Sequence, residues 1–442
     1  MAGFSTRGII EGFYGKPWTH DERLSSIEFL AEIGMNAFVY APKDDLYLRA
    51  LWRTPYSDAD LGRLGELAGK AKGLAIEFTF ALSPGLSMRY ANEDDFRLLV
   101  AKFRQVAALG VSSFALLLDD IPEVLQHPAD AERFASLVAA QAGLINRLIG
   151  ELRSHDAGVR LTVCPTTYWG HGDEPYIVEL GALIDPTVAL YWTGRAICAA
   201  EIETRDATVF SENAQRPPTL WDNFPVNDVA MVGELHIGPY LGREATLDTA
   251  AAGLIANAMP LAEASKIGLY SIAQYLRAPG EFDAEQAWRA ALKRVAGERD
   301  YARFVQFADA VRGSCLCVDD APELGGVLAA FAFGYSFGDR TAAVELLAQH
   351  ARELAATAEF LVDGEVENTA LQREIRPWTL QFQRGIAALE LVARILLDGE
   401  LDDAGREQVW GALVSLRSHR ERVFGDLLDM FLSDLAGEFT LR

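Results

Sequence analysis

The segment Ser113-Phe-Ala-Leu-Leu-Leu-Asp-Asp120 contains the pattern that decides the fold of this chain. Its apolar run from Phe114 to Leu118 is typical of a strand in a parallel sheet, which is buried on both faces. Two carboxylates and Pro122 follow the run, so we expect the strand to end before them. A buried strand that ends in polar side chains predicts a sheet whose functional groups lie at the carboxyl ends of its strands.

Further β-type runs alternate with helical segments from residue 8 to residue 277. These runs are 8–11, 37–40, 76–80, 159–163, 188–192, 219–221 and 267–272. Between them apolar residues recur at helical spacing, as at Leu24, Ile27, Leu30 and Ile33. About eight βα units in about 270 residues are typical of the α/β class and of a (β/α)8 barrel of the TIM type. A doubly wound open sheet is the alternative.

The pattern changes after Gly280, where the strand signals stop and long helical stretches begin. The segment 277–281, Arg-Ala-Pro-Gly-Glu, supplies the chain breakers expected at a boundary. The helical stretches are 284–312, 341–361, 369–397 and 404–435. We therefore predict a catalytic barrel over residues 1–280 and an α-helical bundle over residues 281–442.

Composition narrows the classes of function. The 442 residues include 40 Lys+Arg and 63 Asp+Glu, a formal net charge of -23, which disfavours binding to nucleic acid or to an anionic membrane surface. The four cysteines lack the spacing of a disulfide scaffold or a zinc site, which favours free thiols in a reducing compartment. No signal peptide is visible in residues 1–15, and no apolar stretch approaches the roughly 20 residues of a membrane span. We expect a cytoplasmic protein.

Aromatic, amide and carboxylate side chains recur where the predicted strands end. Flat rings pack against the C–H faces of a sugar ring, and the amides and carboxylates bind its hydroxyl groups. The segments that carry them are 11–15, 40–45, 119–122, 165–169, 191–194 and 221–224, with Asn227 and Asp228 beyond. Their recurrence at one edge of the predicted barrel indicates a carbohydrate site.

Asp119 and Asp120 are the strongest catalytic candidates. Neighbouring side chains of a strand point in opposite directions, so both can enter one pocket only if the backbone leaves strand geometry there. Two close carboxylates titrate as a coupled pair, and one protonated beside one ionised carboxylate can cleave a glycosidic bond. A helix N-cap or a pair of ligands for a divalent metal ion is the alternative.

Other candidates have structural alternatives as well. Lys43 could form a Schiff base or donate hydrogen bonds to a substrate oxygen, or it could be a surface residue paired with Asp44 or Asp45. Aromatic residues at the strand ends are often core residues, and polar ones can be turn formers; they are Tyr14, Tyr168, Trp192, Trp221, Asn223 and Asp228. The seven histidines show no metal-ligand spacing, and no phosphate-binding or serine-hydrolase motif occurs.

A series of motifs occurs in order along residues 7–276. It comprises Gly-Ile-Ile-Glu-Gly-Phe-Tyr-Gly (8–15), Tyr-Ala-Pro-Lys-Asp-Asp (40–45), Ser-Pro-Gly (83–85), Phe-Ala-Leu-Leu-Leu-Asp-Asp (114–120), Cys-Pro-Thr (164–166), Trp-Thr-Gly (192–194), Trp-Asp-Asn (221–223) and Gly-Pro-Tyr (238–240). This series closely resembles glycoside hydrolase family 84, the β-N-acetylglucosaminidases that include O-GlcNAcase and bacterial hyaluronidase-like enzymes. Trp169, directly after Tyr168, is a local departure that could alter the rim of the pocket.

The resemblance implies a reaction and a site. In this family the 2-acetamido group of the substrate acts as nucleophile, and an oxazoline intermediate forms with net retention. By this resemblance Asp119 orients the acetamido N–H, and Asp120 is the general acid and then the general base. The implied sugar-binding residues are Gly12 (through its backbone), Lys43, Tyr168, Trp221, Asn223, Asp228 and Asn257. Neither a cofactor nor a metal ion is expected.

The predicted function is therefore that of a retaining exo-β-N-acetylglucosaminidase that acts on a glycoprotein, a glycopeptide or a small saccharide. Three alternatives stay open. An endo-acting hyaluronidase is disfavoured by the acidic composition, because its polymeric substrate is anionic. A sugar-binding module without activity is disfavoured by the presence of both aspartates, and a metal-dependent hydrolase by the lack of histidine ligands. The natural aglycone and the oligomeric state are not predicted.

Overall fold

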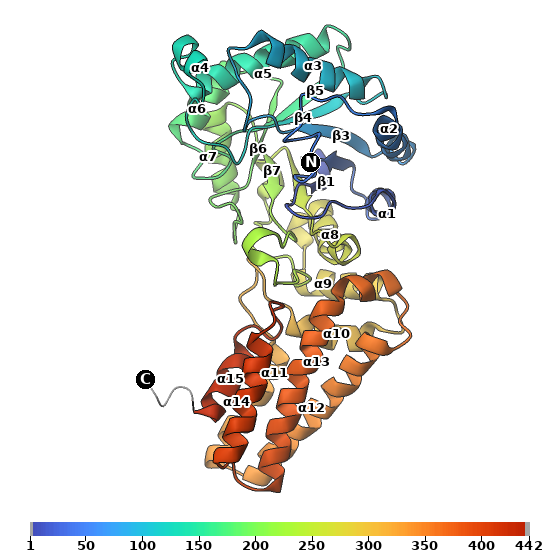
Figure 1. The fold of residues 1–442 in the computed structure, drawn as a ribbon, viewed down its shortest axis with the longest axis vertical. Coiled ribbons are helices and arrows are strands. Elements are labelled where there is room, and N and C mark those ends of the chain that lie inside the picture. The colour runs from blue at the N-terminus through green and yellow to red at the C-terminus, as the bar shows by residue number, and fades with distance from the viewer. Residues whose placement is uncertain (1–2, 438–442) are drawn as a thin grey trace. The chain divides into compact units, whose positions relative to one another are not determined.

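The computed structural model describes residues 3–437, and its first part is a closed barrel of parallel strands (Figure 1). The strands are β1 (Thr6–Glu11), β2 (Ala37–Tyr40), β3 (Glu77–Leu82), β4 (Ser113–Leu117), β5 (Arg160–Cys164), β6 (Ala189–Trp192), β7 (Thr219–Asp222) and β8 (Gly253–Asn257). Each strand pairs in parallel with its neighbour in the sequence, and β8 closes the barrel on β1. The predicted TIM barrel is confirmed, and the open sheet is excluded.

Helices follow the strands around the barrel. They are α1 (His20–Glu32), α2 (Asp58–Gly73), α3 (Glu93–Ala107), α4 (Pro128–Arg133), α5 (Leu137–Arg153), α6 (Pro175–Leu183), α7 (Thr204–Ala214) and α8 (Ala262–Arg277), with short 3-10 turns at 229–231, 247–249 and 279–281. Local sequence defines where several of them begin. At α1 the Thr19 side chain accepts from the backbone N–H of Glu22, and the Glu22 side chain accepts from that of Thr19, which is a capping box.

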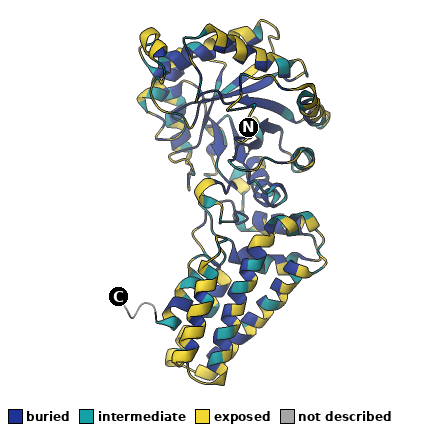
Figure 2. Cartoon of the chain, in the orientation of Figure 1, coloured by how far each residue is buried: buried dark blue, intermediate teal, exposed yellow. Residues whose placement is uncertain are grey.

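The interior of the barrel is apolar, as the strand sequences predict. All residues of β2, β4, β7 and β8 are buried, and the strands are dark blue in Figure 2. Inside the barrel one cluster of buried side chains comprises Ile10, Val39, Ala41, Ala81, Ala115, Leu117, Cys164, Tyr191, Trp221 and Ile255. Because this cluster fills the interior of the barrel, a ligand cannot bind there. In barrels of this type the functional groups lie at the carboxyl ends of the strands.

The prediction of the last strand is wrong. Residues 267–272 lie within helix α8, and the eighth strand is Gly253–Asn257. Ile267, Leu269 and Ile272 are each at most 1% exposed. An apolar run of six residues suits a buried helix segment as well as a strand, because periodicity alone does not separate the two over so short a stretch, so this run gave the wrong element.

The second part is helical. Its helices are α9 (Ala284–Ala296), α10 (Tyr301–Ala310), α11 (Pro322–Phe337), α12 (Arg340–Asp363), α13 (Thr369–Asp398), α14 (Asp403–Arg417) and α15 (Leu427–Ala436). The two longest, α12 and α13, pack along one another. The predicted helices 284–312 and 404–435 are each broken in two, with Gly297 and Gly425 at positive φ in the breaks. Helix α11 was not predicted, because three glycines interrupt its pattern.

The chain divides into two compact units. The first comprises the residues up to 228 with 241–262 and 269–283, and the second comprises 229–240, 263–268 and the residues from 284 onward. The division into a barrel domain over residues 1–280 and a helical bundle domain over residues 281–442 stays a prediction, and the outer ends of these ranges (1–2 and 438–442) lie outside the described residues. Among residues 3–437, no helix is both long enough and apolar enough to cross a membrane.

Candidate active site

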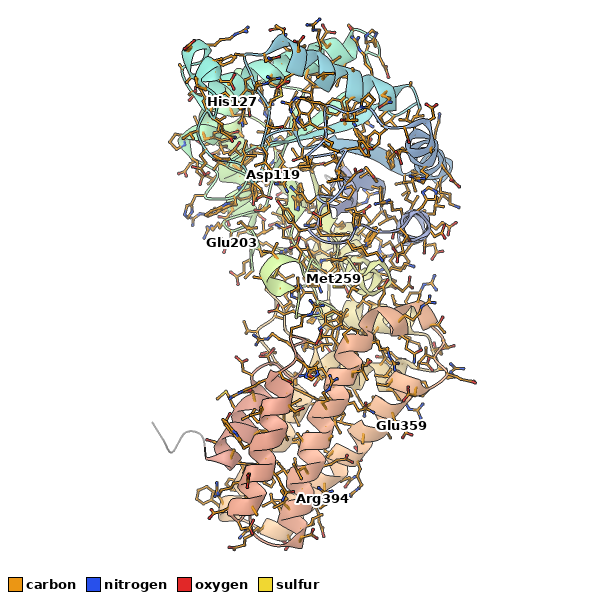
Figure 3. The ribbon with its side chains drawn as sticks, in the orientation of Figure 1. Asp119, His127, Glu203, Met259, Glu359 and Arg394 are labelled. Atoms are coloured by element: carbon orange, nitrogen blue, oxygen red, sulfur yellow. The ribbon has the colours of Figure 1, made fainter. Side chains whose placement is uncertain are left out.

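The two adjacent aspartates lie where strand β4 gives way to its loop. The strand ends at Leu117, and Asp120 adopts a left-handed backbone conformation with φ 53°. The backbone therefore leaves strand geometry at this point, which is the condition under which both carboxylates can enter one pocket. The Asp119 side chain, labelled in Figure 3, is 6% exposed, whereas the Asp120 side chain is 32% exposed. The pair thus consists of one buried and one accessible carboxylate.

Lys43, in the loop after β2, is a cation that lies close to both carboxylates. Its ammonium group forms an ion pair with Asp119 Oδ2, and Lys43 Nζ lies 3.6 Å from Asp120 Oδ2. Burial lowers the pKa of Lys43, but the negative charge of Asp119 and its neighbours outweighs burial and raises it above the ordinary value. Lys43 is therefore a buried cation, neither a surface lysine nor a neutral amine available for a Schiff base.

Asp119 has one oxygen without a partner. Its Oδ1 atom is buried and accepts no hydrogen bond, while Oδ2 binds Lys43. A buried carboxylate oxygen without a donor is costly, and a bound molecule that supplies an N–H or O–H group removes this cost. Asp119 is thus arranged to accept a hydrogen bond from a ligand.

Asp120 accepts hydrogen bonds from two tyrosines. The hydroxyl of Tyr14 donates to Oδ2 at 2.6 Å, and that of Tyr168 donates to Oδ1 at 3.0 Å. Burial raises the pKa of Asp120, but Lys43 and the two hydroxyls together hold it below its ordinary value. Asp120 is therefore ionised at neutral pH in the ligand-free site. To act as an acid it needs a substrate that raises its pKa by excluding water.

Residues at the ends of β1, β7 and β8 lie across the carboxyl end of the barrel, which we call its mouth, from the aspartate pair. Asn257 Oδ1 accepts from the backbone N–H of Gly12 at 3.2 Å, and Asn257 Nδ2 donates to Asn223 Oδ1 at 3.0 Å. Asn223 Oδ1 also accepts from Trp221 Nε1 at 2.9 Å. A Cβ atom at Gly12 would lie 2.7 Å from Trp221 Cζ2, so only glycine fits. These four residues form one connected wall.

Asp228 contacts the backbone of Tyr14, which is a residue that donates to Asp120. Its Oδ2 atom accepts from the backbone N–H of Tyr14 at 2.6 Å, and burial raises the pKa of Asp228. Lys43 Nζ lies 5.8 Å from the centre of the Trp221 ring. The structure therefore brings all nine predicted site residues to the mouth of the barrel. Trp192, by contrast, is fully buried against Phe210 and is a core residue.

Two residues of the site were not among the predicted catalytic and sugar-binding residues. Tyr14, noted only as an aromatic residue after β1, binds Asp120 directly. Arg49 has its guanidinium 5.2 Å from the centre of the Tyr14 ring, and its Nη1 donates to the Tyr14 hydroxyl at 3.0 Å. The position of Tyr14 three residues after a strand was a usable signal. Nothing in the sequence near Arg49 marks it.

The chemistry of the site follows from these contacts. The cation between the two carboxylates is an ammonium group, which repels a divalent metal ion placed there. Within residues 3–437 no group of three or more His, Cys, Asp or Glu side chains could hold a metal ion. One partly exposed carboxylate can exchange a proton, and one buried carboxylate can accept a hydrogen bond. This arrangement suits acid–base chemistry on a polar ligand.

Known proteins resemble this chain in both sequence and structure. A family model for β-N-acetylglucosaminidases matches residues 7–309. The proteins named Protein O-GlcNAcase of Rattus norvegicus and Mus musculus are each 33% identical over 276 residues, which is 61% of this chain and 30% of the relative. The match therefore spans less than a third of the length of these relatives.

Solved structures match over more of their length. A structure of Thermobaculum terrenum O-GlcNAc hydrolase, with one aspartate replaced by asparagine, has a TM-score of 0.93 and 34% identity and covers 98% of this chain and 95% of its own. The structure of CpGH84B has a TM-score of 0.86 and 28% identity and covers 98% of this chain and 77% of its own.

Proposed function

The chain belongs to the β-N-acetylglucosaminidase family of glycoside hydrolases, family 84, and from this premise we propose that it removes terminal β-linked N-acetylglucosamine with net retention. We propose that Ser and Thr glycosides on proteins are among its substrates. The support for this substrate class is the similarity to proteins named O-GlcNAcase and O-GlcNAc hydrolase.

The different environments of the two aspartates carry the proposal. Asp119 is ion-paired, buried and has one unpartnered oxygen, which suits a permanent acceptor for the acetamido N–H of the substrate. Asp120 is partly exposed and accepts from two hydroxyls, which suits a group that gives up and regains a proton.

In the first step the acetamido carbonyl oxygen attacks the anomeric carbon. The bond from this carbon to the aglycone oxygen breaks, and Asp120 transfers its proton to that oxygen. Asp119 accepts the acetamido N–H and stabilises the positive charge that develops on the amide nitrogen. The products of this step are the free aglycone alcohol and an oxazoline intermediate that is protonated on its nitrogen, because the N–H stays hydrogen-bonded to Asp119.

In the second step a water molecule attacks the anomeric carbon from the side that the aglycone left. Asp120, now ionised, takes a proton from the water, and the bond between the anomeric carbon and the acetamido oxygen breaks. The acetamido group is restored and the sugar leaves with its β configuration. The hydroxyls that lower the pKa of Asp120 favour the ionised form that this step requires.

The remaining site residues have binding roles in this proposal. Lys43 and Asn257 bind sugar hydroxyls, while Asn223 and Asp228 bind hydroxyls or the region of the acetamido carbonyl. Tyr168 orients the acetamide. Trp221 and the backbone of Gly12 contact the sugar; Trp221 is 5% exposed, and its ring packs edge-on against that of Tyr191.

The test is the hydrolysis of aryl β-glucosaminides whose N-acetyl group carries zero to three fluorine atoms. Fluorine withdraws electrons from the carbonyl oxygen, so a nucleophilic acetamide predicts a rate that falls steeply with each fluorine. A rate that is indifferent to fluorine would assign the attack to an enzyme carboxylate. Tight binding of N-acetylglucosamine without turnover would favour a sugar-binding module. Asp94→Asn, in an exposed ion pair with Arg97, is the control and should keep the native slope.

A further inference from the structure

Arg49 is linked to Asp120, the proposed general acid, through the side chain of Tyr14. Its Nη1 donates to the hydroxyl of Tyr14 at 3.0 Å, and this hydroxyl donates to Asp120 Oδ2 at 2.6 Å. The Tyr14 backbone is held by Asp228, which accepts from the Tyr14 N–H at 2.6 Å. Asp44 holds the next residue, accepting from the N–H of Gly15 at 3.0 Å. Tyr14 is therefore immobilised between Arg49 and Asp120.

The direction of these hydrogen bonds is set by the chemistry of arginine. A guanidinium group has N–H donors and no acceptor, so the oxygen of Tyr14 must accept at the Arg49 side. The single hydroxyl proton of Tyr14 is then left for Asp120. Without Arg49, the same hydroxyl could instead accept the proton of a protonated Asp120, and that proton would point at Tyr14 rather than at a leaving group.

The positive charge of Arg49 is not neutralised by a carboxylate. Among residues 3–437 the structure gives Arg49 no ion pair, and its Nε atom is buried without a hydrogen-bond partner. Arg53, in the same loop, differs: its Nε and Nη2 bind the two oxygens of Asp95 at 2.8 and 2.6 Å. An arginine that leaves a buried donor unsatisfied while touching the site calls for a functional explanation.

We propose that Arg49 is a positioning residue that orients the Tyr14 hydroxyl toward Asp120 and thereby keeps the Asp120 proton available to the leaving group. This inference rests on the acid–base role of Asp120 in the proposed function. It assigns to Arg49 no contact with the substrate. Its orienting effect passes through Tyr14, while its positive charge also acts on Asp120 directly.

Every charged or titratable group that faces Asp120 bears on the expected effect. Burial raises the pKa of Asp120, and the groups that lower it are Lys43, Tyr14, Tyr168 and Arg49. The carboxyl groups of Asp119 and Asp228 and the thiol of Cys164 also face Asp120. Tyr14 stays a donor because burial raises its own pKa to about 12. Loss of Arg49 removes a positive charge and weakens the donation from Tyr14, and both changes raise the pKa of Asp120.

The experiment measures the titration of Asp120 in the ligand-free protein, from the carboxyl ¹³C resonance of labelled aspartate that disappears in Asp120→Asn. Arg49→Met should move the midpoint upward by about half a pH unit or more. The basic limb of the pH profile of kcat/KM, which reports the free enzyme, should move equally. Arg49→Lys, which keeps a cation, should recover at least part of the shift.

Two further variants separate positioning from a loss of loop structure. Arg53→Met disturbs the same loop without touching Tyr14, so it should leave the midpoint in place. In the Tyr14→Phe background Arg49→Met should add less than half of the shift that it causes alone. An equal shift in that background, or no shift at all, would overturn the proposal. If Arg49→Met does not fold, Arg49→Gln takes its place with the same expected outcome.

The two readouts separate this inference from the proposed function. If the native protein hydrolyses no N-acetylglucosaminide, the proposed function fails, yet the resonance of Asp120 still shows whether Arg49 acts on it. If hydrolysis occurs and the midpoint ignores Arg49, only the inference fails.

Discussion

Lys43 and Asp119 form an ion pair at the mouth of the barrel in which each residue is 4% exposed. Removing one partner of a buried ion pair leaves the charge of the other partner without compensation. The pair therefore links the stability of the protein to its candidate active site, because Asp119 is also the proposed acceptor for the substrate amide.

Lys43→Met should lower the free energy of unfolding by about 3–5 kcal/mol, because it leaves the buried Asp119 carboxylate without a compensating charge. Adding Asp119→Asn removes the stranded charge and should recover part of the loss. Lys70→Met is the control: Lys70 and its partner Glu28 are 37% and 51% exposed, and exposed pairs contribute at most about 1 kcal/mol. Urea denaturation measures all three variants. Similar losses for Lys43→Met and Lys70→Met would contradict the buried-pair argument.

Asp120→Ala should separate substrates by their leaving groups. An alkoxide leaving group needs a proton, so its kcat/KM should fall by roughly 10²–10⁴-fold, while an activated aryl glycoside should lose far less. Asp119→Asn should reduce the rates of both substrates, because it acts on the nucleophile. Steady-state kinetics on a series of aryl and alkyl N-acetyl-β-glucosaminides tests this division. A loss that is the same for every leaving group in both variants would refute it.

Gly12→Ala should impair catalysis without changing a polar side chain. The new Cβ would lie 2.7 Å from Trp221 Cζ2 and 3.2 Å from Asn257 Oδ1, so the wall of the site must move. A displacement of about 1 Å costs on the order of 10²-fold in rate, and we expect a loss of kcat/KM of this size. Gly69→Ala in α2, where nothing lies within 4 Å of the added Cβ, is the control and should keep native kinetics. Native kinetics for Gly12→Ala would mean that the wall adapts freely.

Asp309→Asn should stabilise the protein at neutral pH. Burial raises the pKa of Asp309 from 3.8 to about 6, although the backbone N–H of Glu323, 3.2 Å from its Oδ2, opposes the shift. Between these two pH values the folded state binds more protons than the unfolded state, so the contribution of Asp309 to stability falls as the pH rises and is fully lost above about 6. Asparagine keeps the acceptor for Glu323 and has no charge. Thermal unfolding at pH 4 and pH 7.5 should show a gain in Tm at the higher pH only, and an equal gain at both would exclude the titration of Asp309 as its source.

The barrel was predictable because its signals are local. An apolar run such as 114–118 can be recognised as a strand from a few adjacent residues, and the polar residues after it mark the carboxyl end of that strand. The eighth strand and helix α8 were confused because apolar runs of five or six residues suit both elements. Helix α11 was missed because three glycines lower its helical propensity, a deficit that packing of Leu324, Leu328 and Phe331 offsets in the folded protein.

Six of the nine predicted site residues likewise sit in the sequence motifs given above, whereas Tyr168, Asp228 and Asn257 lie outside them, and their individual binding roles were predicted only from the family resemblance. Tyr14 belongs to such a motif, but its role depends on a hydroxyl that meets a carboxylate 106 positions away. Arg49 belongs to no motif, and only its contact with Tyr14, 35 positions away, reveals it. Contacts of this kind follow from the closure of the barrel, which brings successive loops to one edge.

The sequence by itself determined the alternation of strands and helices, the change to an all-helical region and the residues whose chemistry suits a sugar. These depend on the apolar periodicity and the polar strand ends, which are properties of short segments. Only the tertiary structure decided that Asp119 is buried with an unpaired oxygen while Asp120 is exposed and bound by two tyrosines. Adjacent residues of the same type differ in this way because burial and charge are set by the side chains that surround them, and those come from distant parts of the chain.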